Sequence, residues 1–303
     1  MKITELRPNG FCGGVKRSLQ MVQEVINDPK YPRPLYLLGQ IVHNKFINNA
    51  LHEQGVIILE GNSRLEMLDQ IDHGTVIFTA HGISEQVIQK AKDKNLHIVN
   101  ATCPHVNKSF ELIKEKLAEG YTVIYIGKNH HPETEAALAI DNSIILIEKA
   151  NEVASLNITN DKIALINQTT MSPYDIKEIT DALKDNYPHL TPIDSVCNST
   201  KKRQDALQQI DESVDLVIVI GDRSSNNTQK LRETSEKVLN KTTIAVENVE
   251  DLNGHDLSKY QNIVVTAGTS TPRAIINEII ETLNTNTNAK FVSQLKGMDY
   301  LNS

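Results

Sequence analysis

Short apolar runs alternate along the chain with stretches in which apolar residues recur every three or four positions. Runs such as LVIVI at 216–220 are strand-length and rich in β-branched residues. Apolar residues at helical spacing occupy the stretches 105–119, 173–187, 199–212 and 272–284. Prolines stand where a first helical turn would begin, at Pro104, Pro132, Pro173 and Pro272. This alternation predicts an α/β protein with mainly parallel sheets.

The predicted strands fall into three groups of four. The first group comprises KITEL, LYLL, VIIL and TVIFT, the second HIVN, TVIYI, SIILI and KIALI, and the third TPID, LVIVI, TTIAV and NIVVT. We therefore expect three small α/β units, called repeats below, related by a pseudo-threefold arrangement. Their predicted bounds are 1–95, 96–189 and 190–285, with a C-terminal tail at 286–303 that we expect to return to the first repeat as an added strand.

Each predicted repeat contains the same three phrases in the same order. The first phrase carries a cysteine: FCGGVKR, TCPHVNK and VCNSTKK. The second is a β run ending in Gly and polar residues: YLLGQIVHN, VIYIGKNHHPE and VIVIGDRSSNN. The third is a β run ending in His or hydroxylic residues: VIFTAHGIS, IALINQTTMS and IVVTAGTSTP. All three phrases lie at strand-to-helix corners, where α/β sheets bind ligands, so we expect them to surround one central cavity.

Composition and net charge favour a globular protein over a nucleic-acid-binding or membrane protein. The chain has 303 residues, a net charge of −7 and 39% hydrophobic residues, which is ordinary for a globular protein and argues against general nucleic-acid binding. The N-terminus lacks the apolar region of a signal peptide, and the apolar runs are far shorter than a membrane span. We therefore expect a cytoplasmic protein without membrane or nucleic-acid partners.

Cys12, Cys103 and Cys197 are separated by 91 and 94 residues and are the only cysteines of the chain. An odd number without a secretory signal favours reduced thiols. Thiolates bind zinc, copper(I) or iron–sulfur clusters. Structural zinc normally uses closely spaced CxxC pairs, which are absent here. The spacing favours a [4Fe–4S] cluster with one open iron over a catalytic zinc with a fourth ligand, and three structural thiols remain the alternative.

The other corners are rich in imidazole, hydroxyl and amide groups. They contribute His43, His81, His131, Thr169, Ser225, Asn227 and Ser270. Such groups, together with backbone N–H donors at helix starts, suit a phosphate or diphosphate. Glu133, in NHHPE, is either a first-turn carboxylate that complements a helix dipole or a proton source beside the metal.

Basic residues follow the cysteines at Lys16, Arg17, Lys108, Lys201, Lys202 and Arg203. We expect them to form solvated helix faces, some of which could present a positive surface to an acidic electron donor. No GxGxxG turn follows a strand, so direct use of a nicotinamide cofactor is not expected.

These phrases together resemble the 4-hydroxy-3-methylbut-2-enyl diphosphate reductase (LytB) family over essentially all of 1–285. The resemblance is carried by RPNGFCGGV, VHN, TAHGIS, ATCPHV, HPE, QTT, SVCNST, SSNN and TAGTSTP. It implies that Cys12, Cys103 and Cys197 hold one [4Fe–4S] cluster per chain. It further implies that Glu133 delivers protons and that Thr169 lies near the substrate hydroxyl.

The resemblance also implies a diphosphate site. Its residues would be His43, His81, His131, Ser225, Asn227 and Ser270. Asn226 departs from members that have Ser at this position, but its amide can still donate to a phosphate oxygen. The implied reaction is a two-electron reductive dehydroxylation of an allylic diphosphate that gives isopentenyl and dimethylallyl diphosphates, with flavodoxin or ferredoxin as electron donor. The alternatives are a zinc-containing protein that binds a phosphorylated metabolite and a zinc hydrolase.

Overall fold

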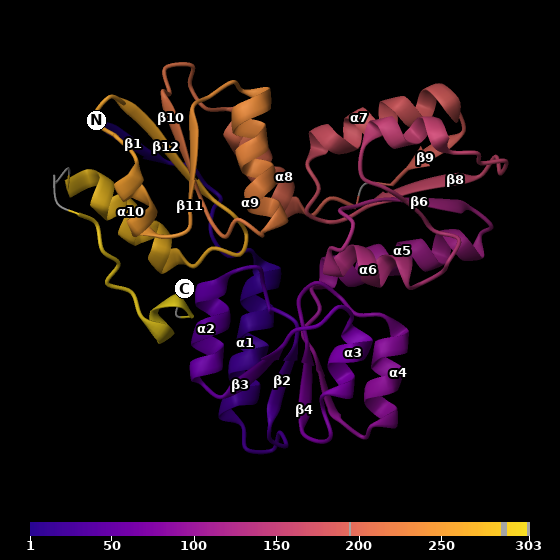
Figure 1. Ribbon diagram of the computed structural model, residues 1–303. Coiled ribbons are helices and arrows are strands. Elements are labelled where there is room, and N and C mark those ends of the chain that lie inside the picture. Colours follow the sequence, from indigo (N-terminus) through magenta and orange to yellow (C-terminus); the bar gives the residue numbers. More distant parts are fainter. Residues whose placement is uncertain (194, 286–289, 302–303) are drawn as a thin grey trace. The chain divides into compact units, whose positions relative to one another are not determined.

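The computed structural model describes residues 1–193, 195–285 and 290–301. It contains three four-stranded sheets (Figure 1), and parallel pairing, such as Thr75 opposite His97, occurs in each of them. The first sheet has the order β3 (Val56–Leu59), β2 (Leu35–Leu38), β4 (Thr75–Phe78) and β5 (His97–Asn100). The second has the order β7 (Ile145–Ile147), β6 (Thr122–Ile126), β8 (Ile163–Asn167) and β9 (Leu190–Pro192). The third has the order β1 (Lys2–Glu5), β12 (Asn262–Ala267), β10 (Leu216–Ile220) and β11 (Thr243–Val246).

Helices connect the strands, as the periodicity predicts. The α-helices are α1 (Gly13–Asn27), α2 (Lys45–Glu53), α3 (Arg64–Asp69), α4 (Glu85–Asp93), α5 (Pro104–Ala118), α6 (Pro132–Leu138), α7 (Pro173–Asn186), α8 (Asn198–Gln208), α9 (Asn226–Glu233) and α10 (Arg273–Thr285). Shorter helical segments are η1 (Ala150–Ser155), η2 (Thr234–Val238), η3 (Val249–Gly254) and η4 (Gly297–Tyr300). Pro104, Pro132 and Pro173 each begin a helix, and Pro272 directly precedes α10. Among the described residues, no helix is both long and apolar enough to span a bilayer.

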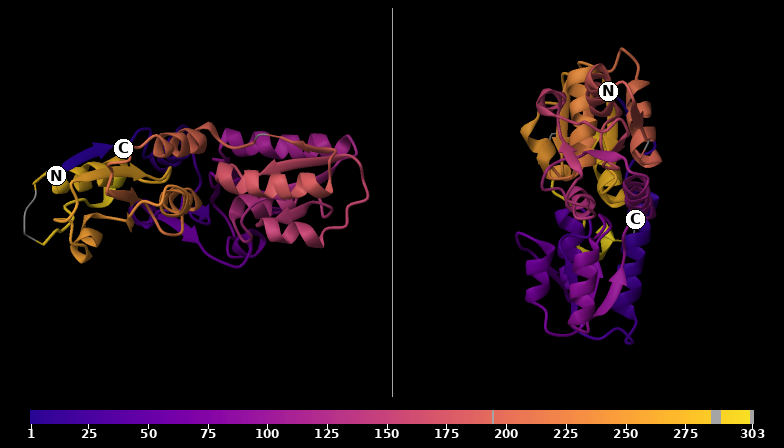
Figure 2. Two further views of the ribbon diagram at one scale, coloured as in Figure 1. Left: turned by 90° about the horizontal axis from the view of Figure 1, so that it is seen from above. Right: turned by 90° about the vertical axis from the view of Figure 1, so that its right-hand side faces the viewer.

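Helices cover both faces of the second and third sheets. In the second sheet, α7 lies on one face and α5 and α6 lie on the other (Figure 1). In the third sheet, α8 and α9 lie opposite α10 (Figure 1). Figure 2 shows the same ribbon turned by 90° about the horizontal and the vertical axis. Every residue of β8 and β10 is therefore buried. This explains why these strands appear in the sequence as unbroken apolar runs and not as an alternating pattern.

The first strand of each predicted repeat pairs outside that repeat. β1 pairs with β12, β5 with β4 and β9 with β8. The expected grouping of these strands is therefore wrong. For β5 and β9 the physical reason is that a parallel strand pairs with its predecessor through a crossover helix, such as α4 between β4 and β5. β1 has no preceding strand and instead pairs with β12 at the edge of the third sheet. The apolar pattern is the same for either grouping. The repeat bounds at 95, 189 and 285 stay a prediction.

Internal contacts divide the chain into two compact units. The terminal unit contains Met1–Leu19, Val42–Val56 and Ser199–Ser303. The central unit contains Gln20–Ile41 and Ile57–Asn198. The first and second sheets lie essentially in the central unit, and the third sheet lies in the terminal unit.

The C-terminal tail contacts α2 within the terminal unit. The Tyr300 ring stacks on the Phe46 ring with 5.1 Å between centroids, and the Gln54 side chain approaches the Met298 sulfur at 3.1 Å. The predicted added strand is wrong for residues 290–301, which contain only η4, and residues 286–289 and 302–303 of the tail lie outside the described residues. Because Tyr300 is mostly buried, side-chain packing attaches the tail where the sequence suggested backbone pairing.

Candidate active site

Each cysteine stands directly before a helix. Cys12 precedes α1, Cys103 precedes α5 and Cys197 precedes α8. All three are half-buried, and none of them forms a disulfide. The first turn of a helix presents unpaired N–H groups and the positive end of the helix dipole, which favour a negatively charged sulfur.

The cysteine backbones are anchored in one repeated way. The N–H of Cys12 donates to the Thr269 carbonyl at 3.3 Å, that of Cys103 to Ala80 at 3.0 Å and that of Cys197 to Thr169 at 3.1 Å. Each acceptor belongs to the third phrase of the repeat. The same hydrogen bond therefore occurs three times: the backbone of each cysteine is bonded to the loop that follows the neighbouring strand of its sheet.

The donor set fits a thiolate-bound cluster. Three accessible sulfurs at helix starts, with no disulfide among them, suit an iron–sulfur cluster better than they suit a hard cation. Cys103 and Cys197 belong to the central unit, and Cys12 belongs to the terminal unit. A single site shared by the three sulfurs therefore stays a prediction.

Glu133 is a buried acid in the first turn of α6, with 2% of its surface exposed. Burial raises the pKa of its carboxyl to about 7, although hydrogen bonds from Thr169 and Tyr125 act in the opposite direction. Dipole complementarity alone does not require such burial. At neutral pH this carboxyl can both hold and release a proton, as a general acid must.

Thr169 pairs with Glu133 through two hydrogen bonds. The Thr169 N–H donates to Glu133 Oε1 at 2.7 Å, and the Thr169 hydroxyl donates to Oε2 at 2.9 Å. A hydroxyl can also accept a proton from the neutral acid while donating its own. The geometry of this contact is compatible with proton transfer between the carboxyl and the hydroxyl.

Tyr125 is the third hydrogen-bond donor to the Glu133 carboxyl. Its hydroxyl donates to Glu133 Oε1 at 3.5 Å, and its ring is fully buried in β6. Burial, followed by the Glu133 charge, raises the pKa of Tyr125 well above its ordinary value. Tyr125 therefore remains a neutral phenol that supports the acid.

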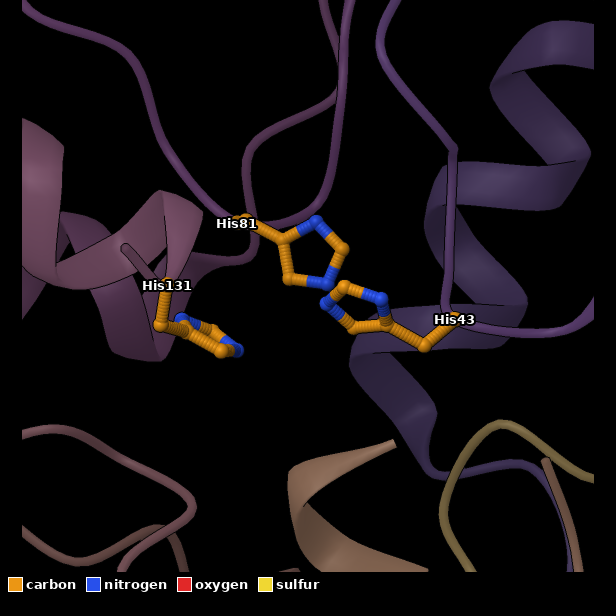
Figure 3. Close-up of side chains that lie close together, drawn as sticks. All are labelled: His43, His81 and His131. Carbon is orange, nitrogen blue, oxygen red and sulfur yellow. The ribbon is translucent and has the colours of Figure 1, made fainter. Parts of the chain in front are cut away.

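His131 and His81 lie together in the central unit (Figure 3). Their ring centroids are 5.5 Å apart in an edge-to-face arrangement. His131 caps α6, because its Nδ1 accepts the Glu133 N–H at 3.1 Å. We assign the remaining ring proton to Nε2, which makes this nitrogen a donor. The His131 ring is thus bonded to the backbone of Glu133, and the His81 ring packs against the His131 ring.

A close backbone approach fixes the His81 corner. Gly82 has φ +89°, and a Cβ at this position would lie 2.6 Å from the Phe110 ring of α5. Only glycine fits both the conformation and the space. The glycine of TAHGIS therefore allows the corner that carries His81 to pack against the helix that begins after Cys103.

Arg64 is a residue that no repeated phrase marks. It begins α3, is half-buried, and donates to the Pro132 carbonyl at 3.2 Å and to the Thr79 hydroxyl at 3.4 Å. Thr79 in turn lies 3.4 Å from His81 Nδ1. Burial lowers the pKa of Arg64 to about 10, partly opposed by the Glu135 charge, so the side chain stays cationic. Arg64 thus connects the His81 corner to the start of α6.

Replacing Arg64 by Met is expected to lower kcat/KM about tenfold or more, because small misplacements of catalytic groups are costly. Arg64→Lys should recover part of the loss, since the charge remains. The matched control is Lys90→Met, which removes a cation that donates to the Leu65 carbonyl of α3. Steady-state kinetics of the three variants, with circular dichroism as a check on folding, measure the effect. Equal losses in Arg64→Met and Lys90→Met would contradict a specific role.

The terminal unit carries the hydroxyl and amide donors. Ser225 caps α9 by accepting the Thr228 N–H at 3.5 Å, and the Ser270 hydroxyl donates to Ser225 Oγ at 3.2 Å. Asn227 Oδ1 accepts the Thr269 N–H at 2.9 Å. Among the described residues, no group accepts from the buried Asn227 Nδ2. An orphaned donor at a helix start fits an anion.

The remaining predicted contacts of the terminal unit are Asn226 and His43. Asn226 is the buried first residue of α9, and half-buried His43 precedes α2. His43 lies in the terminal unit, whereas His81 and His131 lie in the central unit. A common diphosphate site formed by all these side chains stays a prediction.

The basic residues after the cysteines are not all solvated. Lys16, Arg17, Lys108, Lys201 and Lys202 are exposed, as expected. Arg203 is 3% exposed and donates to the Gly10 carbonyl at 2.6 Å and to the Ser199 carbonyl at 2.8 Å. The expectation of a solvated Arg203 is therefore wrong, because its guanidinium supports the loop that leads to Cys12.

Thiols at three helix starts, an edge-to-face pair of imidazoles and one buried acid of raised pKa are features of an enzyme active site in an α/β protein. The model of the family described as LytB protein matches residues 3–284, and the chain belongs to this family.

Related proteins are similar over nearly their full length. A protein of Geobacillus sp. (strain WCH70), named 4-hydroxy-3-methylbut-2-enyl diphosphate reductase, is 43% identical over 284 residues, which cover 93% of this chain and 90% of the relative. A protein of Bacillus mycoides (strain KBAB4) with the same name is 44% identical over 285 residues, covering 94% and 90%.

Solved structures of the family share the fold. The E-1-hydroxy-2-methyl-but-2-enyl-4-diphosphate reductase of Plasmodium falciparum aligns with a TM-score of 0.87 at 31% identity, over 97% of this chain and 94% of that one. A second reductase structure, of the terminal enzyme of the non-mevalonate pathway, aligns with a TM-score of 0.66 at 27% identity, over 94% and 100%. The expected α/β fold with three small parallel sheets is confirmed.

Proposed function

We propose that the chain is a 4-hydroxy-3-methylbut-2-enyl diphosphate reductase of isoprenoid biosynthesis. The reaction adds two electrons and two protons to the allylic alcohol diphosphate, breaks the C–O bond of its hydroxyl group and releases water. The products are isopentenyl and dimethylallyl diphosphates. The observation that carries the proposal is the buried hydrogen bond between Glu133 and Thr169 in a chain of the LytB family. The pKa of the Glu133 carboxyl in this contact is raised to about 7.

The cofactor of the proposal is one [4Fe–4S] cluster per chain, held by Cys12, Cys103 and Cys197. Bound there, it would supply the electrons and a Lewis-acidic iron at its open position. Membership of the family implies a metal cluster, and the choice of [4Fe–4S] rests on the three cysteines at helix starts, which form no disulfide. Family relatives named as reductases make the alternative zinc protein or hydrolase the weaker reading.

Glu133 and Thr169 would supply the proton that leaves with the hydroxyl group as water, and the second proton of the reaction forms the new C–H bond of the product. In its neutral form Glu133 donates to Thr169 Oγ1, and the Thr169 hydroxyl passes its own proton toward the departing hydroxyl group of the substrate. Water leaves more easily than hydroxide, so a proton delivered at this oxygen lowers the barrier. The 2.9 Å contact is short enough for the first transfer.

The diphosphate would be bound by the hydrogen-bond donors that the sequence predicts. These are His43, His81, His131, Ser225, Asn226, Asn227 and Ser270. Two of these donors are best defined. His131 Nε2 carries the ring proton because Nδ1 accepts the Glu133 N–H, and Asn227 Nδ2 is buried without an acceptor among the described residues. By binding the diphosphate, these donors would hold the attached short hydrocarbon in a fixed orientation. A fixed orientation lowers the entropic cost of reaching the transition state and so raises the rate.

A flavodoxin or ferredoxin would deliver electrons one at a time. Exposed Lys16, Arg17, Lys201 and Lys202 follow the cysteines in sequence and suit an acidic donor. Three cysteines without a disulfide, together with such a donor, would suit the reducing environment of the cytoplasm.

Anaerobic purification, followed by iron, sulfide and zinc analysis and a turnover assay, tests the proposal. We expect about four iron and four sulfide per chain, as a [4Fe–4S] cluster requires, and reductant-dependent formation of both products. Zinc without sulfide, or product release that needs no reductant, would contradict it.

A further inference from the structure

We propose that Asp222 is a positioning residue that fixes two diphosphate-binding segments of the terminal unit against each other. The segments are the start of α2, which follows His43, and the start of α9, which carries Ser225 and Asn227. The inference rests on the proposed function, because it concerns that diphosphate site. Asp222 is not among the predicted site residues.

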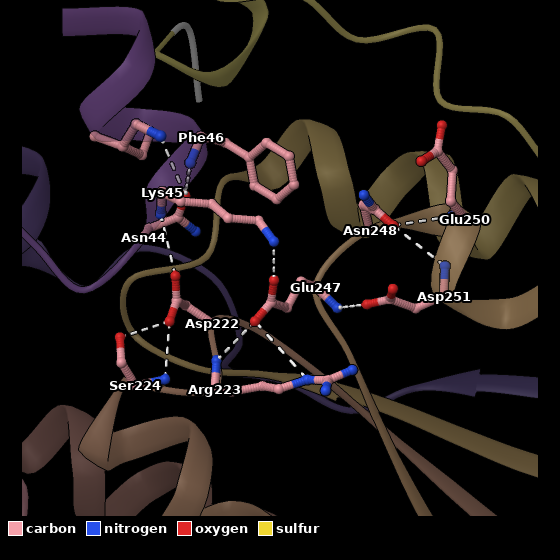
Figure 4. A network of polar contacts seen from close by, with 11 residues as sticks. Asn44, Lys45, Phe46, Asp222, Arg223, Ser224, Glu247, Asn248, Glu250 and Asp251 are labelled. Carbon is pink, nitrogen blue, oxygen red and sulfur yellow. Dashed lines mark hydrogen bonds and ion pairs between the residues drawn. The ribbon is translucent and has the colours of Figure 1, made fainter. Parts of the chain in front are cut away.

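The contacts of Asp222 reach both segments (Figure 4). It follows Gly221 at the carboxyl end of β10 and is half-buried. Its Oδ1 accepts the Ser224 N–H at 2.8 Å and the Ser224 hydroxyl at 2.6 Å. Its Oδ2 accepts the N–H of Lys45 at 3.1 Å. One carboxylate therefore bonds the turn before α9 and the first residue of α2.

The start of α2 depends on this bond. Asn44 caps the helix by accepting the N–H groups of Phe46 at 3.0 Å and Ile47 at 3.2 Å. Asn44 does not accept from Lys45, the first residue of the helix, whose N–H instead donates to Asp222. Because the first N–H groups of a helix have no intrahelical acceptor, Asp222 completes the cap and fixes the direction in which the chain leaves His43.

The start of α9 depends on the same carboxylate. Both Ser224 contacts hold the turn 222–225, and Ser225 is the cap of α9. The Ser225 hydroxyl meets Ser270, and Asn227 follows two residues later. A change in this turn would therefore displace three predicted diphosphate contacts at once.

A second carboxylate holds the Lys45 side chain. Glu247, after β11, forms an ion pair with Lys45 Nζ and accepts the Arg223 N–H at 3.2 Å (Figure 4). Burial tends to raise the pKa of Asp222, but hydrogen bonds from Ser224 and Lys45 and the charge of His43 bring it below its ordinary value. Asp222 is thus ionised at neutral pH and lies close enough to His43 to interact with its charge.

The charge of Asp222 opposes the binding of a diphosphate. If its charge acted mainly on the ligand, the neutral variant Asp222→Asn would bind an anion more tightly. If Asp222 acts mainly by positioning, the same variant binds more weakly. The sign of the change therefore distinguishes the two roles.

The experiment compares Asp222→Asn with Asp215→Asn in the cluster-loaded protein. Asp215 lies at the opposite end of β10 and also accepts two backbone N–H groups, from Gln261 at 2.7 Å and Asn262 at 3.1 Å. Calorimetric titration with inorganic pyrophosphate and with dimethylallyl diphosphate gives the dissociation constants. We expect Asp222→Asn to weaken both about tenfold, or about 1.4 kcal/mol, and Asp215→Asn to change them by less than about twofold, since distant sites act independently.

Two further readouts separate positioning from a general loss of structure. In Asp222→Asn we expect faster amide exchange at the start of α2 and a raised KM with little change in kcat. Glu247→Gln, which leaves the Asp222 bonds intact, should weaken binding less than about threefold, because exposed ion pairs contribute little. Equal or tighter pyrophosphate binding by Asp222→Asn, or equal weakening by Asp215→Asn, would overturn the proposal.

Failure of the proposed function has a different signature. A wild-type protein that binds pyrophosphate but forms no reduced product would contradict the reductase, and weaker binding by Asp222→Asn would still support the positioning role. Absence of pyrophosphate and dimethylallyl diphosphate binding in the wild type would overturn the positioning role itself.

Discussion

Glu133→Gln is expected to retain the metal cluster and lose most of the turnover, with kcat falling about 10²- to 10⁴-fold, the usual contribution of a general acid. Gln is nearly isosteric with Glu. Its amide oxygen can still accept the Thr169 N–H that now bonds Glu133 Oε1 at 2.7 Å, so the local structure should persist. An amide has no acidic proton to relay through the Thr169 hydroxyl. Steady-state kinetics at fixed reductant, with iron analysis of the same samples, measure the effect.

The pH dependence follows from the raised pKa of Glu133. Burial raises this pKa to about 7, so the carboxyl is mostly protonated below pH 7 and mostly ionised above it. Because the proposed role requires the acid form, kcat should be highest on the acid side and fall as pH rises through about 7, approaching tenfold per pH unit. The residual activity of Glu133→Gln should lack this dependence.

Glu135→Gln is the matched control for both measurements. Glu135 lies in the first turn of the same helix but is exposed, so its loss should leave the rate and the pH profile nearly unchanged. Full activity in Glu133→Gln, or an unchanged alkaline limb of its profile, would remove Glu133 from the mechanism.

The strands and helices could be predicted from the sequence because the burial of each element leaves a local pattern of apolar residues. Each residue of β10 is buried between helices, so the run LVIVI carries its own signal. The pairing of β1 with β12 could not be predicted, because these strands are about 260 residues apart and either grouping buries the same apolar residues. Strand order depends on which crossover helix packs where, and local periodicity does not contain that information.

The sequence could indicate which residues are candidates for the site, but it could not predict their burial, their hydrogen-bond partners or their pKa values. The HPE phrase marked Glu133 as a candidate acid, but its pKa depends on burial and on Thr169, which is 36 residues away in sequence. Arg203 stands in a charged run, KKR, and only the fold places its guanidinium against the Gly10 carbonyl. Arg64 and Asp222 act through backbone carbonyl and N–H groups of distant segments, contacts that leave no motif in the chain.

Cys103→Ser is expected to lose the cluster, its colour and all measurable turnover. A serine hydroxyl is a poor substitute for a thiolate, which iron–sulfur clusters require. The fold should survive, because the backbone N–H of residue 103 still donates to the Ala80 carbonyl and Pro104 still begins α5. Iron and sulfide content after anaerobic reconstitution, together with circular dichroism, separates loss of the cluster from loss of structure.

The same substitution at the other cysteines tests whether one metal site joins the two units. Cys12 belongs to the terminal unit, and Cys103 and Cys197 belong to the central unit, so Cys12→Ser should match Cys103→Ser only if all three sulfurs hold one cluster. His105→Gln, which changes an exposed side chain in the first turn of α5, is the control and should keep its iron. Full iron and sulfide in Cys12→Ser would make that sulfur structural, and zinc bound in place of iron would favour the zinc protein.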